Sequence, residues 1–197
     1  MRRFSLFRAS IFIGIFFGLI IFPFYVDAAV REINSPSSKS GCSAVLLKNQ
    51  DYFPALIKSI DEAKSEIIMS FFLFKAGVHK NSYPDRVLAH LAKSAQKGVR
   101  VLVILENSGD HDRNLDAENR QTKKLLKAKG VEVYFDSPRK TMHNKLIVID
   151  QRLVLLGSHN LTQAALKYNN EISILIDHPE LAKEARTYML TIIKEAK

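Results

Sequence analysis

Apolar residues follow two alternating patterns along the chain, one typical of strands and one typical of helices. Short continuous apolar runs indicate strands buried on both faces, and apolar residues spaced three and four apart indicate amphipathic helices. The strand-like runs are 43–47, 67–74, 99–106 and 131–136. The helix-like segments between them are 51–66, 84–98 and 118–130. This β-α-β-α-β rhythm predicts an α/β fold with a mainly parallel central sheet in this half of the chain.

Local signals support the helix boundaries. Asp51 is placed to cap the first helix, Pro84 stands at the start of the second, and Gly98 stands at its end. The third helix also ends at a glycine.

The rhythm changes in the last third of the chain. Residues 143–150 and 152–158 form two apolar runs with almost nothing between them, which predicts a hairpin because a parallel crossover needs a longer connection. A short helix (162–168), a strand (171–177) and a closing helix after Pro179 follow. The expected fold is therefore an α/β sandwich whose central sheet is parallel to mixed and flanked by helices. No internal repeat is visible.

The amino terminus has the composition of an export signal. Arg2, Arg3 and Arg8 precede an uncharged apolar run at 11–26, and Ala28 follows as the end of a small-residue cleavage site. An uncleaved membrane anchor is the alternative, because the run nearly has the length of a membrane span. We therefore expect an exported (periplasmic or secreted) protein or one anchored by 11–26.

These patterns divide the chain into three parts. Residues 1–28 are expected to be the signal peptide or anchor, residues 29–41 a polar linker, and residues 42–197 one domain. Cys42 is the only cysteine, which excludes a disulfide within the chain and a cysteine-based zinc cluster.

The net charge of +9 changes the picture of possible partners. Removal of residues 1–28 would lower it only to +7, because three Arg and one Asp would be lost. A basic surface attracts polyanions, so nucleic acid and anionic lipid are both candidate partners.

The segment HNKLIVID at 143–150 places candidate chemistry on the hairpin. His143 and Lys145 are two residues apart, so on a strand both side chains point to one face, whereas Asp150 has the opposite parity. An imidazole beside an ammonium group can attack a phosphate and neutralise its oxygens. Gly157 permits close backbone approach, and Ser158 and Asn160 add neutral donors. An isolated His-x-Lys, however, is common by chance.

The complete spacing is specific. His143-x-Lys145, then Asp150, then Gly157-Ser158-x-Asn160 resembles, without a gap, the HKD signature of the phospholipase D superfamily. The region 42–197 is similar in length and element order to the small, single-motif bacterial nuclease branch. The resemblance implies a metal-independent phosphodiesterase without a cofactor.

The same resemblance implies roles for the site residues. His143 would form a covalent phosphohistidine, Lys145 and Asn160 would hold phosphate oxygens, and Ser158 would lie beside them. Asp150 would support the site without touching substrate. Glu171 falls where the family has an acidic residue that orients the histidine ring.

Only one His-x-Lys occurs in the chain. Cleavage through a phosphohistidine needs a second histidine to protonate the leaving oxygen, and the chain is too short for a second motif. We therefore expect a symmetric homodimer that completes the active site.

Three further features bear on substrates and metals. Residues 109–116 superficially resemble a calcium loop, but Leu115 replaces the required glycine, so no metal site is expected. Arg139 and Lys140, directly before the catalytic strand, are candidate phosphate contacts. A basic helix face remains either solvated or part of a nucleic-acid groove, and consists of Lys123, Lys124, Lys127 and Lys129.

Three functions stay open at this stage. The leading one is a non-specific endonuclease that cleaves DNA or RNA. The second is a lipid hydrolase of the phospholipase D or cardiolipin type, and the third is a non-catalytic nucleic-acid-binding protein.

Overall fold

A computed structural model of the chain describes residues 42–196. The expected signal segment (1–28) and linker (29–41) lie outside the described residues. The strands are β1 (Ser43–Lys48), β2 (Glu66–Phe71), β3 (Arg100–Leu105), β4 (Glu132–Phe135), β5 (Lys145–Ile149), β6 (Leu153–Gly157) and β7 (Ile172–Asp177). The helices are η1 (Asn49–Asp51), α1 (Tyr52–Glu62), α2 (Tyr83–Gln96), α3 (Arg113–Lys127), α4 (Gln163–Lys167) and α5 (Pro179–Glu195).

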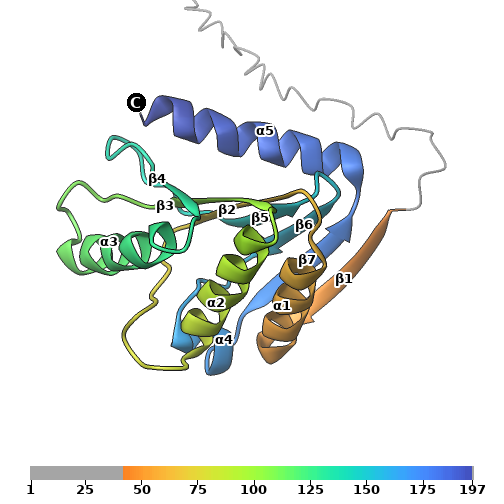
Figure 1. Ribbon diagram of the computed structural model, residues 1–197, viewed down its shortest axis with the longest axis horizontal. Coiled ribbons are helices and arrows are strands. Elements are labelled where there is room, and N and C mark those ends of the chain that lie inside the picture. Colours follow the sequence, from red (N-terminus) through yellow and green to blue (C-terminus); the bar gives the residue numbers. More distant parts are fainter. Residues whose placement is uncertain (1–41, 197) are drawn as a thin grey trace, which may run out of the picture. The chain divides into compact units, whose positions relative to one another are not determined.

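The strands form one seven-stranded sheet in the order β1-β7-β6-β5-β2-β3-β4 (Figure 1). The strands β2, β3 and β4 are parallel, and the remaining neighbours are antiparallel. The predicted α/β sandwich with a mixed sheet is confirmed. Its parallel part is smaller than expected, because β1 pairs with β7 at the far edge and not with β2.

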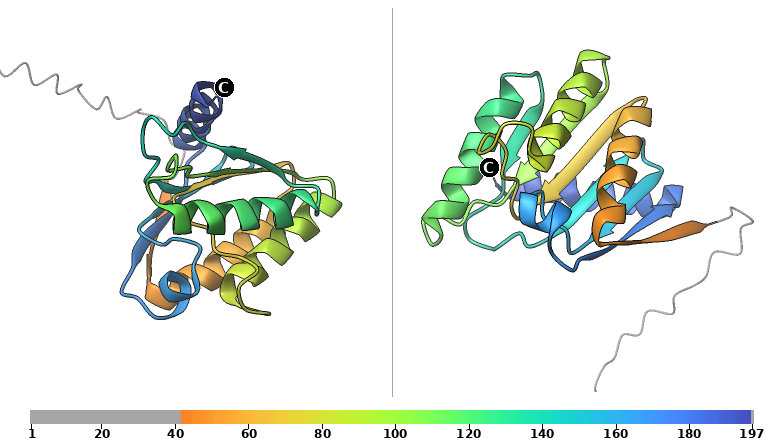
Figure 2. Two further views of the ribbon diagram at one scale, coloured as in Figure 1. Left: turned by 90° about the vertical axis from the view of Figure 1, so that its left-hand side faces the viewer. Right: turned by 90° about the horizontal axis from the view of Figure 1, so that it is seen from below.

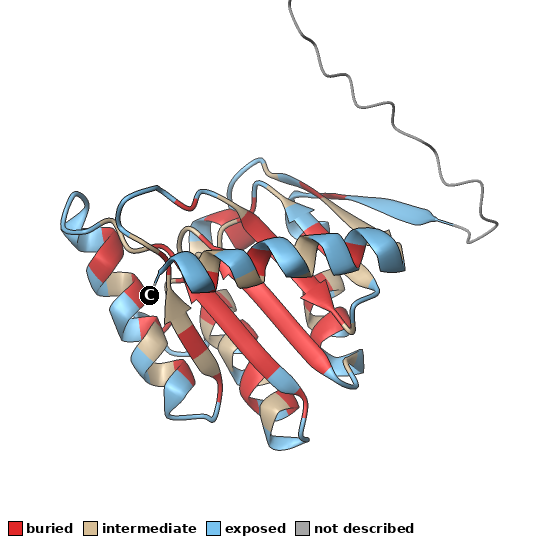
Figure 3. Ribbon diagram, turned by 90° about the horizontal axis from the view of Figure 1, so that it is seen from above, coloured by how far each residue is buried: buried red, intermediate tan, exposed pale blue. Residues whose placement is uncertain are grey.

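Helices cover the two faces of the sheet unequally. The helices α1, α2, α3 and α4 lie on one face and α5 lies alone on the other (Figure 2). Seen from the α5 side, this single helix crosses the buried central strands and leaves β1 exposed beyond it (Figure 3).

The core follows the period of the strands. Ile67, Met69 and Ile147 face the layer of helices α1 to α3, and Ile68, Leu146 and Val148 face α5. All six residues of β2 are buried, as the continuous apolar run predicted.

Side chains at the helix ends explain most of the boundaries. Ser82 accepts a hydrogen bond from the Asp85 amide at the start of α2, and Thr162 accepts one from the Ala165 amide at the start of α4. Asp51 occupies the capping position of α1, but its side chain makes no capping bond, so that prediction is wrong. The 3-10 turn η1 runs directly into α1 and its geometry replaces the expected cap.

The third helix begins earlier than the sequence pattern suggested. It starts at Arg113 and not at 118, because Asp112 accepts a hydrogen bond from the Leu115 amide at 3.0 Å. Part of the expected acidic loop is therefore helix, and its carboxylates serve local structure. The buried Asp116 carboxylate accepts the amides of Ser108 and Asp110.

Candidate active site

Four adjacent strands end or begin at one end of the sheet. Because β5 is antiparallel to both β2 and β6, the ends of β2 and β6 meet the beginnings of β5 and β7 there. This arrangement brings together five residues that the sequence nominated, namely His143, Lys145, Ser158, Asn160 and Glu171.

His143 and Lys145 differ sharply in exposure. His143 precedes β5 and is exposed, whereas Lys145 is the first residue of β5 and is only 6% exposed. The Lys145 ammonium donates a hydrogen bond to the His143 carbonyl at 2.9 Å. Burial lowers the pKa of Lys145, and the nearby Glu171 carboxylate partly opposes this shift. The buried ammonium is therefore bonded to the backbone of the residue whose imidazole is accessible.

Phe72 links the two residues and was not singled out from the sequence. Its ring meets the His143 ring edge-on at a centroid distance of 4.8 Å, and the Lys145 ammonium lies 5.1 Å from its centroid. Both contacts are of the kind that aromatic rings favour. Phe72 belongs to a run of similar apolar residues, so nothing in the sequence distinguished it from the core phenylalanines.

Ser158 and Glu171 form the second half of the site. The Ser158 hydroxyl donates a short hydrogen bond to the Glu171 carboxylate and accepts the Ile172 amide at 3.1 Å. Asn169 donates to the other carboxylate oxygen at 3.1 Å. Among the described residues, no hydrogen bond joins Glu171 to His143, so the expected contact with the histidine ring is not found. The carboxylate instead fixes Ser158.

Gly157 is required by space and not by its backbone angle. A Cβ atom built at this position would lie 2.1 Å from the Ser173 hydroxyl and 2.4 Å from the Ile172 carbonyl oxygen. The predicted close backbone approach is confirmed. Strand β7 therefore packs closely against the end of β6, directly before Ser158.

Buried groups fix the turn that carries Ser158 and Asn160. His159 is fully buried, stacks on Tyr52 at 4.2 Å, and bonds the Ser173 hydroxyl and the Asn49 carbonyl. Burial lowers the pKa of His159, which favours the neutral ring. The Asn160 carbonyl oxygen is buried and has no hydrogen-bond partner within residues 42–196.

Asp150 lies at the opposite end of β5 from Lys145. Its carboxylate accepts the amides of Lys64, Ser65 and Glu66 and the Ser65 hydroxyl at 2.8 to 3.0 Å. Asp150 and Gln151 both have positive φ in a tight turn that the Arg152 amide closes on the Ile149 carbonyl at 3.0 Å. The supporting role expected of Asp150 is thus structural, and we place it outside the group that can touch substrate.

Arg139 and Lys140 are exposed on the segment that leads into the site. Lys140 lines a cavity of about 170 Å³ that also borders Met142 on this segment and Tyr188 on α5. Their contact with a phosphate stays a prediction. Within residues 42–196, no group of three or more His, Cys, Asp or Glu side chains is arranged to hold a metal ion. In the same residues, no helix has the length and apolarity of a membrane span.

The mixed sheet with this histidine and lysine at the strand ends defines a phospholipase D-like protein. The chain belongs to the phospholipase D superfamily, because residues 56–193 match the family described as "Cardiolipin synthase, PLD-like domain". Members of this superfamily are phosphodiesterase-type enzymes.

Several curated relatives carry lipid names. The chain is 32% identical to cardiolipin synthase B of Shigella flexneri over 63% of its own length and 31% of the relative. It is 35% identical to a phospholipase D of Rickettsia bellii, over 62% of this chain and 54% of the relative. It is 26% identical to the mitochondrial cardiolipin hydrolase of Mus musculus, over 84% and 70%. The chain thus spans about a third to two thirds of these proteins.

Solved structures share the fold over almost their whole length. The phospholipase D family member Nuc of Salmonella typhimurium superposes with a TM-score of 0.67 at 22% identity, covering 80% of this chain and 97% of Nuc. NucT of Helicobacter pylori gives a TM-score of 0.64 at 18% identity, covering 79% and 98%.

Proposed function

We propose that this protein is a metal-independent phosphodiesterase that cleaves nucleic acid through a phosphohistidine at an active site shared by two copies. The observation that carries the proposal is the exposed His143 with the buried ammonium of Lys145 bonded to its backbone carbonyl. The net charge of +9 favours a polyanionic substrate. The sequence resemblance to the single-motif nuclease branch supports the same substrate class.

The chemistry proceeds in two steps. A ring nitrogen of His143 attacks phosphorus, the bond from phosphorus to the leaving oxygen breaks, and His143 of the second copy donates its proton to that oxygen. Water then attacks the phosphohistidine, its proton returns to the second histidine, and the free imidazole is regenerated. Lys145 and Asn160 stabilise the charge on the non-bridging oxygens.

The α5 face of the sheet suits the second copy. Leu46, Leu156 and Ile172 are 55%, 45% and 53% exposed, and their strand register places them on the α5 side. Leu156 and Ile172 adjoin the segments that carry Ser158 and Glu171. Exposed apolar residues next to a site with one histidine favour a symmetric contact there.

A direct test uses the purified full-length chain in EDTA on plasmid DNA, single-stranded DNA, RNA and phospholipid vesicles. We expect cleavage of nucleic acid that the His143→Ala variant lacks. Release of lipid headgroup alone would assign the protein to the activity that its lipid-named relatives suggest, and binding without turnover would assign a non-catalytic role.

A subunit-mixing experiment tests the shared site. His143→Asn subunits are exchanged into wild-type dimers at increasing fractions. If each turnover needs both histidines, activity falls with the square of the wild-type fraction. A linear fall would mean that each copy works alone.

Matched variants test the contact surface. Leu46→Lys should weaken self-association in sedimentation velocity, because a lysine would be buried in the contact. Val45→Lys is the control, because Val45 is 53% exposed on the same strand but faces the other side of the sheet. Equal behaviour of the two variants would exclude the α5 face as the contact.

Export or anchoring through residues 11–26 stays a prediction.

A further inference from the structure

Two buried carboxyl groups lie together where neighbouring parallel strands end. Glu106 follows β3 and Asp136 follows β4, directly after the paired residues Leu105 and Phe135. Glu106 is 2% exposed and Asp136 is 4% exposed. Neither takes part in a salt bridge within residues 42–196. Buried carboxyl groups without a cation are costly unless they are protonated or well bonded.

Glu106 holds the backbone at the entrance to the catalytic strand. Its carboxyl group accepts the amide of Met142 at 2.5 Å, and Met142 immediately precedes His143. The buried side chain of Met142 packs in the α5-side core. The preceding residues Pro138, Arg139 and Lys140 are exposed, so this bond anchors the segment just before the histidine.

Asp136 completes the arrangement. Its carboxylate accepts the Asn107 amide at 2.7 Å, and its own amide bonds the Leu105 carbonyl at 3.1 Å. The side chain of Asn119 on α3 bonds the Glu106 carbonyl at 3.0 Å. The Asp136 carboxylate is thus fixed to the backbone directly after Glu106, and the Glu106 carboxyl group to the backbone directly before His143.

Burial raises the pKa of Glu106 to about 7, and burial also raises the pKa of Asp136. The charge of the neighbouring Asp136 further disfavours ionisation of Glu106. The Asp116 carboxylate on α3 also disfavours ionisation of Glu106, and Arg120 pairs with Asp116 at 3.5 Å. The ionisable groups that share the cavity beside Asp136 are Lys140, Tyr188 and Glu195.

We propose that Glu106 and Asp136 share one proton and act as a positioning pair for His143, with Glu106 setting the backbone of Met142. When the shared proton leaves, both groups are ionised and the two adjacent carboxylates repel each other. Glu106 then shifts together with the Met142 amide to which it is bonded. The histidine then loses its alignment. This inference rests on the proposed function only in taking His143 as the nucleophile.

The test compares pH profiles of kcat on bis(p-nitrophenyl) phosphate for the full-length chain and three variants. Glu106→Gln keeps an acceptor for the Met142 amide and a donor for Asp136, but it cannot ionise. We expect wild-type kcat to fall from pH 6 to pH 9 at least fivefold more than kcat of the Gln variant, since both retain proton donation by the second histidine. Glu106→Ala should lose about tenfold in kcat at every pH, with KM within about twofold.

Asp116→Asn is the matched control, because Asp116 is a buried carboxylate that bonds loop amides but not Met142. It should lower the melting temperature and keep the alkaline limb, moved only slightly toward lower pH, because Asp116 acts on Glu106 through its charge alone. A Gln variant with the wild-type alkaline limb would overturn the proposal.

A second readout does not depend on turnover. The amide proton of Met142, followed by NMR, should shift with pH in the wild type and stay constant in the Gln variant. If no phosphodiester is cleaved but this titration is present, the proposed function fails and the pair stands. A wild-type Met142 amide that does not titrate overturns the pair itself.

Discussion

The two ends of β5 carry the two halves of one sequence motif and treat their polar groups in opposite ways. At the Asp150 end, polar groups are paired: Asp150 accepts four hydrogen bonds, and Glu66 accepts a two-point contact from Arg186. At the His143 end, the histidine is exposed, and the buried side-chain oxygens (Oδ1) of Asn144 and Asn160 lack partners within residues 42–196. Saturated bonding holds the hairpin at the Asp150 end, whereas the His143 end leaves an imidazole accessible to solvent.

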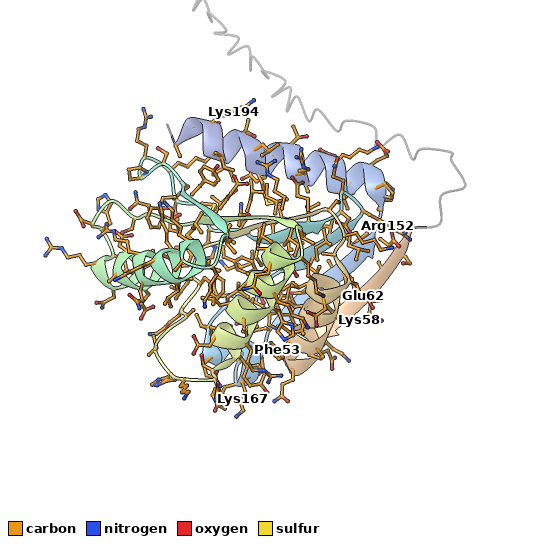
Figure 4. All side chains as sticks on the ribbon, viewed as in Figure 1. Phe53, Lys58, Glu62, Arg152, Lys167 and Lys194 are labelled. Atoms are coloured by element: carbon orange, nitrogen blue, oxygen red, sulfur yellow. The ribbon has the colours of Figure 1, made fainter. Side chains whose placement is uncertain are left out.

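The contrast extends to the surroundings of the two ends. Arg152 lies on the hairpin turn near the start of α5 and pairs with Asp177. Figure 4 shows it far from Lys167, which lies at the end of α4. The larger cavity, about 770 Å³, borders Asp150 and Arg152 and is remote from His143. Hollow volume therefore does not mark the candidate site in this protein, and the chemistry of the strand ends does.

The largest effect is expected from the substitution His143→Asn. Because His143 is exposed, we expect the melting temperature to stay within about 2 °C while turnover falls on the order of 10⁴-fold or more. Calorimetry and phosphodiester cleavage measure the two quantities. Substantial residual turnover would move the nucleophile elsewhere.

Gly157→Ala should damage both fold and site. The added methyl group would overlap the Ser173 hydroxyl and the Ile172 backbone, and we expect a loss of about 3 kcal/mol in the free energy of unfolding. Gly98→Ala is the control, because its φ of +88° is strained for alanine but the space around it is open, so about 1 kcal/mol is expected. Urea unfolding compares the two, and similar losses would contradict the packing argument.

Asp150→Asn should reduce stability without altering the chemistry. The amide cannot accept all four hydrogen bonds, so we expect a loss of about 2 kcal/mol in the free energy of unfolding. The kcat of the folded fraction should remain within about twofold of wild type. A large fall in kcat at unchanged stability would mean that Asp150 takes part in the chemistry.

Phe72→Leu sharpens the description of the catalytic end. Loss of the contacts with His143 and Lys145 should lower kcat about tenfold, equivalent to about 1.4 kcal/mol, and Phe72→Tyr should restore it. Phe53→Leu is the control: Phe53 contacts Arg86 at 4.8 Å, away from the strand ends, and its loss should affect stability alone. Equal kcat values for both Leu variants would remove Phe72 from the site.

Stability should respond to pH in opposite directions at the two ends. Burial alone would raise the pKa of Asp150, but its hydrogen bonds lower it, so its stabilisation is present above the usual value of 3.8 and is lost as the pH falls below it. The pKa of Glu106 is raised from 4.5 to about 7, so its contribution is full below 4.5 and is lost as the pH rises through 7. Unfolding measured from pH 3 to 9 should therefore have a smaller acid slope in Asp150→Asn and a smaller alkaline slope in Glu106→Gln.

The sequence by itself determined the strands, the hairpin and the family. Apolar runs and helical spacing located nearly every element, because burial of apolar side chains follows the backbone period. The spacing from His143 to Asn160 identified the superfamily, and Gly157 was correctly assigned to a close approach. The ends of the segments were predicted less accurately. The first turn of α3 is polar and was not predicted as helix, but the cap at Asp112 begins the helix there.

Only the tertiary structure decided which polar residues meet. The antiparallel pairing of β5 sends Asp150 to the far end of the sheet and brings Phe72, the residue directly after β2, beside His143. The parallel pairing of β3 and β4 places Glu106 against Asp136, although 29 residues separate the Asn107 amide from its Asp136 acceptor. Periodicity indicates the face of a strand on which a side chain lies. The order and direction of the strands determine which side chains are its neighbours, and that order depends on contacts between distant parts of the chain.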